Sequence, residues 1–137
     1  MSPETRNLID GRLVDSETGK TFPNVNPATE EVIGATADAT AADMDRAIGA
    51  ARRAFDETRW STDAAFRARC LRQLHAALTK AKDELREVVV AEAGSPIILG
   101  YSVQCDATID WFPFWADVAE RFTYESPMPD KIGRAHV

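Results

Sequence analysis

The chain has 137 residues, 45% hydrophobic and 28% charged, a balance typical of one soluble globular domain or of the first part of a larger protein. Its 16 Lys and Arg against 22 Asp and Glu give a net charge of −6. Because phosphate binding requires clustered basic side chains, this acidic balance argues against nucleic acid and anionic membranes as partners. No apolar run approaches the roughly 18 residues that span a bilayer, so no membrane partner is expected.

The two cysteines, Cys70 and Cys105, lie far apart and form no C-x-x-C motif. Residues 1–6 carry no basic-then-apolar signal pattern and are expected to form a flexible N-terminus. These observations predict a reducing, cytoplasmic location.

The first third of the sequence predicts short strands separated by turns. Asp10-Gly11 favours the positive φ values of a tight hairpin, and Thr18-Gly19 supplies another turn. Pro23 has no N–H to donate, so it fits an edge strand or a break. A turn at Asn26-Pro27 then leads to a short strand over residues 32–35. We therefore predict a β-meander.

A helix is predicted to begin at Thr40, whose side chain can accept the N–H of Asp43 in a capping box. Behind this cap, apolar residues recur at helical spacing: Met44, Ala47, Ile48, Ala51 and Phe55. Ser61-Thr62-Asp63 is predicted to cap the next helix. A third helix runs from about residue 82 to Gly94, a natural C-terminal residue that Pro96 follows.

Residues 97–122 are more apolar, and we predict one helix that Pro113 kinks or interrupts. Four aromatic residues near its middle lie on two neighbouring faces: Trp111, Phe112, Phe114 and Trp115. Such a helix requires cover on nearly every side, and a meander with three or four helices can hardly supply it.

Several side chains are candidates for chemistry, and each also has a structural interpretation. Cys70 lies on an apolar helix face, which hides a thiol, and Cys105 stands beside the acidic Asp106; a structural role is the alternative for both. His75 has no nearby second ligand. Asp106 and Asp110 share a face at i, i+4 and could carry acid/base work, but only with a further group and a cleft. The Gly-x-Gly-x-x-Gly and Gly-x₄-Gly-Lys-Ser/Thr phosphate loops are absent. Taken together, these candidates predict no catalytic constellation, no cofactor site and no metal site.

The order of these signals closely resembles the N-terminal region of the NAD(P)-dependent aldehyde dehydrogenase superfamily. The resemblance rests on "LIDGRLVDSETGKTFPNVNPATEEVIG", then "DMDRAIGAARRAFDETRWS", then "RARCLRQLHAALTKAKDELREVVVAEAGSP", and finally "WADVAERF". It covers residues 7–126. It implies an α/β fold: the N-terminal portion of a cofactor-binding domain, with a β-meander, then a helical layer, and most of the Rossmann-like sheet missing.

The resemblance implies an enzyme that oxidises an aldehyde to a carboxylic acid with NAD or NADP. In the family a thiolate attacks the aldehyde, hydride passes to the cofactor, and the thioester is hydrolysed. The family's catalytic and cofactor-binding residues match no position here, so this chain alone is predicted to be inactive and to bind no cofactor. The full-length protein is expected to be a homo-oligomer.

One part of the sequence is placed near substrate by the resemblance. The helix after Gly94-Ser95-Pro96 lines the aldehyde tunnel in relatives, and register puts Val103 and Ala107 on that wall; core packing is the alternative for both. Ser95 replaces the usual lysine, and Pro113 is unusual in the tunnel helix. Both departures leave the aldehyde open.

A second hypothesis is a complete small α+β interaction domain without enzymatic activity. Exposed aromatics around residues 111–115 would suit a partner-binding surface. They would equally suit a helix whose covering sheet lies elsewhere.

The last residues differ in character from the rest. Residues 127–131 are interpreted as a truncated linker. "IGRAHV", residues 132–137, resembles nothing in the family and equals one reading frame of a common short-read sequencing adapter. We therefore hypothesise read-through there, and interpret the chain as an N-terminal fragment.

Overall fold

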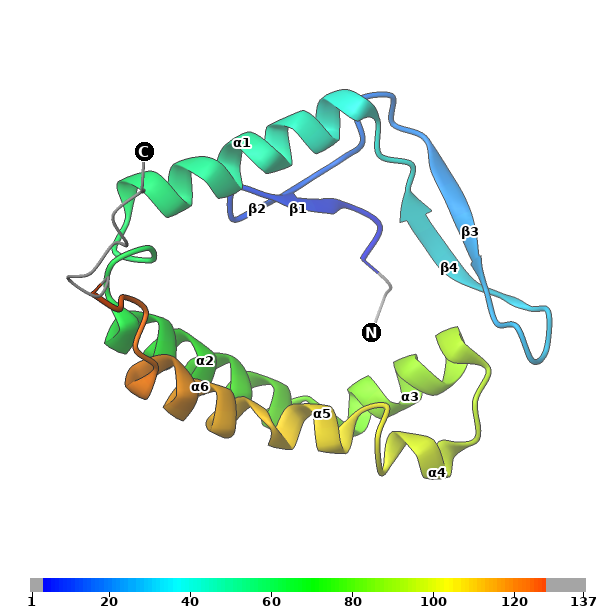
Figure 1. Cartoon of the computed structure of the whole chain (residues 1–137). Coiled ribbons are helices and arrows are strands. Elements are labelled where there is room, and N and C mark those ends of the chain that lie inside the picture. Colours follow the sequence, from blue (N-terminus) through cyan, green and yellow to red (C-terminus); the bar gives the residue numbers. More distant parts are fainter. Residues whose placement is uncertain (1–3, 128–137) are drawn as a thin grey trace, which may run out of the picture.

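The computed structural model of the chain describes residues 4–127 (Figure 1). Short antiparallel strands come first and helices follow, so the predicted α/β class is confirmed. The linker and read-through hypotheses concern segments that lie, apart from residue 127, outside the described residues.

The strands pair as two separate hairpins. β1 (Asn7–Ile9) pairs with β2 (Arg12–Val14), and the turn between them has φ values of 53° at Asp10 and 72° at Gly11, as predicted. β3 (Thr21–Val25) pairs with β4 (Val32–Ala37). The two hairpins do not join into one meander within residues 4–127, because each sheet has two strands. Every strand is therefore an edge, which is why Pro23 is tolerated in β3.

Three long helices begin and end close to the residues that the sequence predicted. α1 (Ala41–Glu57) begins with the complete Thr40–Asp43 capping box. α2 (Ala64–Lys80) is capped by Asp63, which accepts the N–H of Phe66. α3 (Lys82–Ala93) ends at Gly94, whose φ of 61° is left-handed.

The prediction of a single helix over residues 97–122 is wrong. The segment forms α4 (Ile97–Gly100), α5 (Asp106–Asp110) and α6 (Phe112–Arg121). After α4, the carbonyl of Leu99 accepts from the N–H groups of Ser102 and Gln104, and this turn stops the helix. Pro113 lies in the first turn of α6. The N–H groups of a first turn have no hydrogen-bond partner within the helix, so the missing N–H of proline costs no helical hydrogen bond there.

The helical half of the chain is held by α2 and α6, which lie side by side (Figure 1). Ala68 of α2 and Ala116 of α6 are fully buried, and such small side chains allow close approach. Arg72 of α2 adds ion pairs at 2.8 Å to Asp117 and to Glu120. The buried hydrophobic residues are few and mostly small: Ala37, Ala50, Ala68, Cys105, Ile109 and Ala116.

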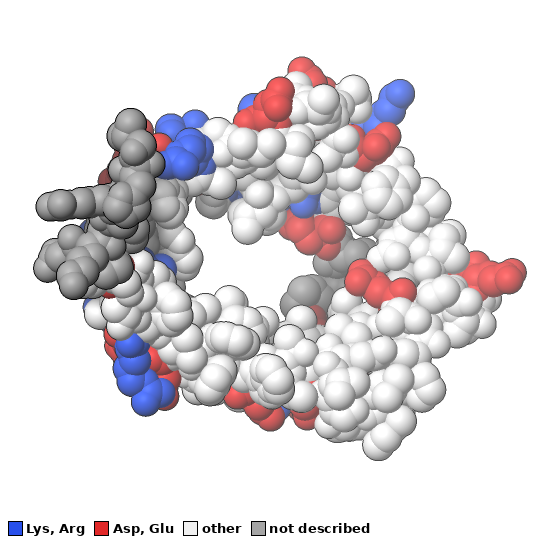
Figure 2. Space-filling view, in the orientation of Figure 1, with Lys and Arg blue, Asp and Glu red and all other residues white. Residues whose placement is uncertain are grey.

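Within residues 4–127 the elements form an open ring, and Figure 2 shows that side chains leave its centre open. α1 and the hairpins form one side of the ring, and the other helices form the opposite side (Figure 1). The predicted apolar stripe of α1 is largely uncovered, since Met44, Ile48 and Phe55 are all exposed. None of the helices described combines the length and apolar character needed to cross a bilayer.

Candidate functional site

The structure gathers Val103 and Ala107 at one surface hollow of about 430 Å³. Its wall belongs to the turn before α5, to α5 itself and to the start of α6. The full lining, called the α5–α6 hollow from here on, is Val103, Ala107, Thr108, Trp111, Phe112 and Trp115.

The spacing of the lining residues explains why they share one side. Val103, Ala107, Trp111 and Trp115 follow one another at intervals of four, which brings side chains to one face of a helical path. Trp111 lies between α5 and α6 and is 61% exposed. Val103 and Ala107 are the residues for which the family resemblance predicts a place on a tunnel wall, and that role stays a prediction. The same spacing brings in Trp111 and Trp115, which the sequence indicated only as aromatic residues on an apolar helix.

Ion pairs fasten α5 to α3 beside the hollow. Arg86 of α3 donates to both carboxylate oxygens of Asp106, from Nε at 2.7 Å and from Nη2 at 2.8 Å. Lys82 lies 3.1 Å from Asp110 and 3.7 Å from Asp106. The Arg86 guanidinium also covers the ring of Tyr101, 4.4 Å from its centroid. We call Lys82, Arg86, Asp106 and Asp110 the α3–α5 clamp.

The clamp decides between the two interpretations of the carboxylate pair. Hydrogen bonds from Arg86, and the charges of Arg86 and Lys82, lower the pKa of Asp106 below its ordinary value of 3.8. A carboxyl with a lowered pKa is ionised at neutral pH and is a poor proton donor there. The ion pairs of Asp106 with Arg86 and of Asp110 with Lys82 hold α5 against α3, and neither carboxylate lines the hollow.

Asp106→Asn is expected to loosen α5 and lower the thermal midpoint by about 2–5 °C. The reason is loss of a bidentate pair whose carboxylate side chain is only 19% exposed. Asp110→Asn is the matched control: its side chain is 62% exposed with one ion pair at 3.1 Å, and a shift below about 1 °C is expected. Thermal unfolding followed by circular dichroism at pH 7 measures both. Equal shifts would show that the clamp does not depend on Asp106.

The cysteines and His75 form no site with the residues around them. Cys105 is buried at the start of α5, and Cys70 is half-buried in α2; both are free thiols. His75 is half-buried in the same helix. Across residues 4–127 no group of three or more His, Cys, Asp or Glu side chains is placed to hold a metal ion.

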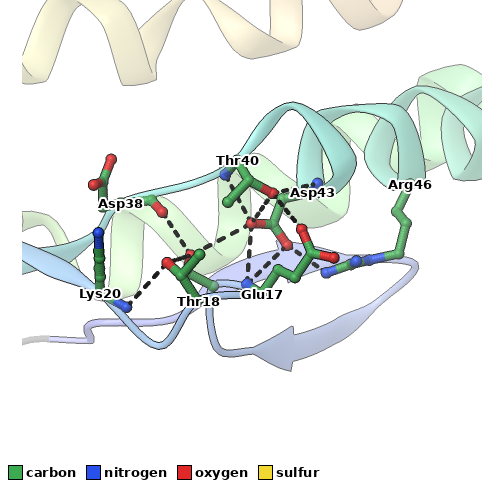
Figure 3. Close-up of polar contacts among 8 residues, drawn as sticks. Glu17, Thr18, Lys20, Asp38, Thr40, Asp43 and Arg46 are labelled. Carbon is green, nitrogen blue, oxygen red and sulfur yellow. Dashed lines mark hydrogen bonds and ion pairs between the residues drawn. The ribbon is translucent and has the colours of Figure 1, made fainter.

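A second polar cluster lies at the start of α1, where Asp43 is 1% exposed (Figure 3). The N–H of Thr40 donates to its carboxylate at 2.8 Å, and the N–H of Glu17 donates to it from 3.2 Å. Arg46 forms an ion pair with it, and the hydroxyl of Ser16 lies 3.4 Å away. We call these residues the Asp43 cluster. It joins the β2–β3 loop to α1.

These contacts lower the pKa of Asp43, first through the Thr40 N–H and then through the Glu17 N–H, against the opposing effect of burial. The Asp43 carboxylate is thus ionised, and its neighbours supply the hydrogen bonds and the positive charge that stabilise it. Its geometry indicates a structural role, since the cluster does not line the α5–α6 hollow.

Comparison with known proteins identifies the fold. The profile of the Aldehyde dehydrogenase family matches residues 13–136. Aldehyde dehydrogenase family 2 member B4, mitochondrial, from Arabidopsis thaliana is 38% identical over 129 residues, covering 93% of this chain and 22% of that protein. Benzaldehyde dehydrogenase, mitochondrial, from Antirrhinum majus is 32% identical over 133 residues, covering 94% of this chain and 25% of that protein.

Solved structures agree with these relatives. The crystal structure of PnpE in complex with nicotinamide adenine dinucleotide superposes with a TM-score of 0.84 at 30% identity, covering 96% of this chain and 26% of that one. The crystal structure of a putative aldehyde dehydrogenase from Burkholderia cenocepacia superposes with a TM-score of 0.84 at 32% identity, covering 95% of this chain and 26% of that one.

The two hairpins followed by paired helices thus have the arrangement found in the N-terminal part of aldehyde dehydrogenase structures. The chain belongs to the aldehyde dehydrogenase family, which confirms the resemblance seen in the sequence. It spans about a quarter of the length of the relatives it matches.

Proposed function

We propose that this chain forms the N-terminal part of an enzyme that oxidises an aldehyde to a carboxylic acid with NAD⁺ or NADP⁺. The observation that carries the proposal is the superposition of 96% of the chain on an aldehyde dehydrogenase-like structure solved with nicotinamide adenine dinucleotide. Relatives whose names specify aldehyde dehydrogenase activity support it. The full-length protein would act as a homo-oligomer in the cytoplasm.

In this proposal the chain shapes the path of the substrate and leaves the chemistry to other residues. Val103 and Ala107 would form part of the aldehyde tunnel wall, supported by their shared position on the α5–α6 hollow. In the same proposal the dinucleotide would be held by residues outside this chain; the absence of a glycine-rich phosphate loop from residues 4–127, whose positive-φ glycines stand singly at Gly11, Gly19 and Gly94, supports this. Buried Cys105 is a poor nucleophile.

The proposal predicts that the full-length protein encoded by the gene reduces NAD⁺ or NADP⁺ in the presence of simple aldehydes, whereas residues 1–137 alone do not. Absorbance at the nicotinamide band, with propanal and benzaldehyde as substrates, measures this. The control is the full-length protein without aldehyde. Turnover by residues 1–137 alone would contradict the proposal that the chemistry lies in residues outside this chain. Absence of turnover by the full-length protein would contradict the proposed aldehyde oxidation.

The interaction-domain hypothesis keeps one observation in its favour, the exposure of Trp111, Phe114 and Trp115. Expression of residues 1–130 separates the two ideas. A cooperative, monomeric melt without binding of an apolar dye would support a complete small domain. Aggregation or a molten state would support the N-terminal part of a larger enzyme.

A further inference from the structure

We draw no further inference here: the strongest candidate, the cavity of about 350 Å³ between the β3–β4 hairpin and α3 that Glu84 and Glu92 line, carries nothing because Glu92 already accepts a hydrogen bond from Asn24 at 2.8 Å and no second observation within residues 4–127 indicates a ligand for the two carboxylates.

Discussion

Asp43→Ala is expected to lower the thermal midpoint of the full-length protein proposed above by roughly 5 °C or more. Alanine removes one side of the capping box and leaves the N–H groups of Thr40 and Glu17 without their acceptor. The damage reaches two elements, because the carboxylate joins the β2–β3 loop to the start of α1. Thermal unfolding by circular dichroism at pH 7 measures the shift.

Asp45→Ala is the matched control, since Asp45 is exposed in the same turn of α1. Its midpoint should change by less than about 1 °C. Asp43→Asn adds a pH test. The lowered pKa of Asp43 stabilises the fold fully above its ordinary value of 3.8, and this stabilisation is lost as pH falls through the lowered pKa. The midpoints of wild type and Asp43→Asn should therefore converge on acidification. A difference in thermal midpoint that stays the same at every pH would contradict a stabilising role for the charge of Asp43.

Local signals in the sequence predicted the helix ends well. Thr40, Asp63 and Gly94 act within one turn of their own helices, so their types and spacing contain the needed information. The contact between Asp43 and Glu17 joins residues 26 positions apart. No periodic pattern in the sequence encodes such a contact. The capping box predicted that Asp43 accepts the N–H of Thr40, but not that it also accepts the N–H of Glu17 in the β2–β3 loop.

The segment over residues 97–122 shows why the sequence could not predict the whole lining of the α5–α6 hollow. Its apolar character favoured one helix, but a backbone turn closed on the carbonyl of Leu99 ends α4, and α6 begins anew at Phe112. Ion pairs from α3 then fix α5, and these contacts depend on the tertiary arrangement. The family resemblance predicts that Val103 and Ala107 belong to a tunnel wall. The structure shows that both line one hollow together with Trp111, Phe112 and Trp115.

Gly94→Ala is the second substitution for which we expect a large effect, a loss of about 2–5 kcal/mol in the free energy of unfolding. Gly94 has a φ of 61°, which costs an L-residue roughly 1–2 kcal/mol. An added Cβ would also lie 2.7 Å from Cγ of Pro27 and 2.9 Å from the backbone nitrogen of Ala28. Because Ala28 presents backbone there, relief requires the β3–β4 loop to move away from the end of α3.

Gly11→Ala separates the two causes. Gly11 has a φ of 72°, but a Cβ added there would meet no atom within 4 Å, so this variant carries the backbone strain without the clash. Chemical denaturation should show a loss of about 1–2 kcal/mol for Gly11→Ala and the larger loss for Gly94→Ala. A hydrogen bond from Asn24 to Glu92, 2.8 Å long, also joins β3 to α3 nearby. Equal losses in the two glycine variants would mean that the loop yields freely, and that the β3–β4 hairpin is not held against α3 through Gly94.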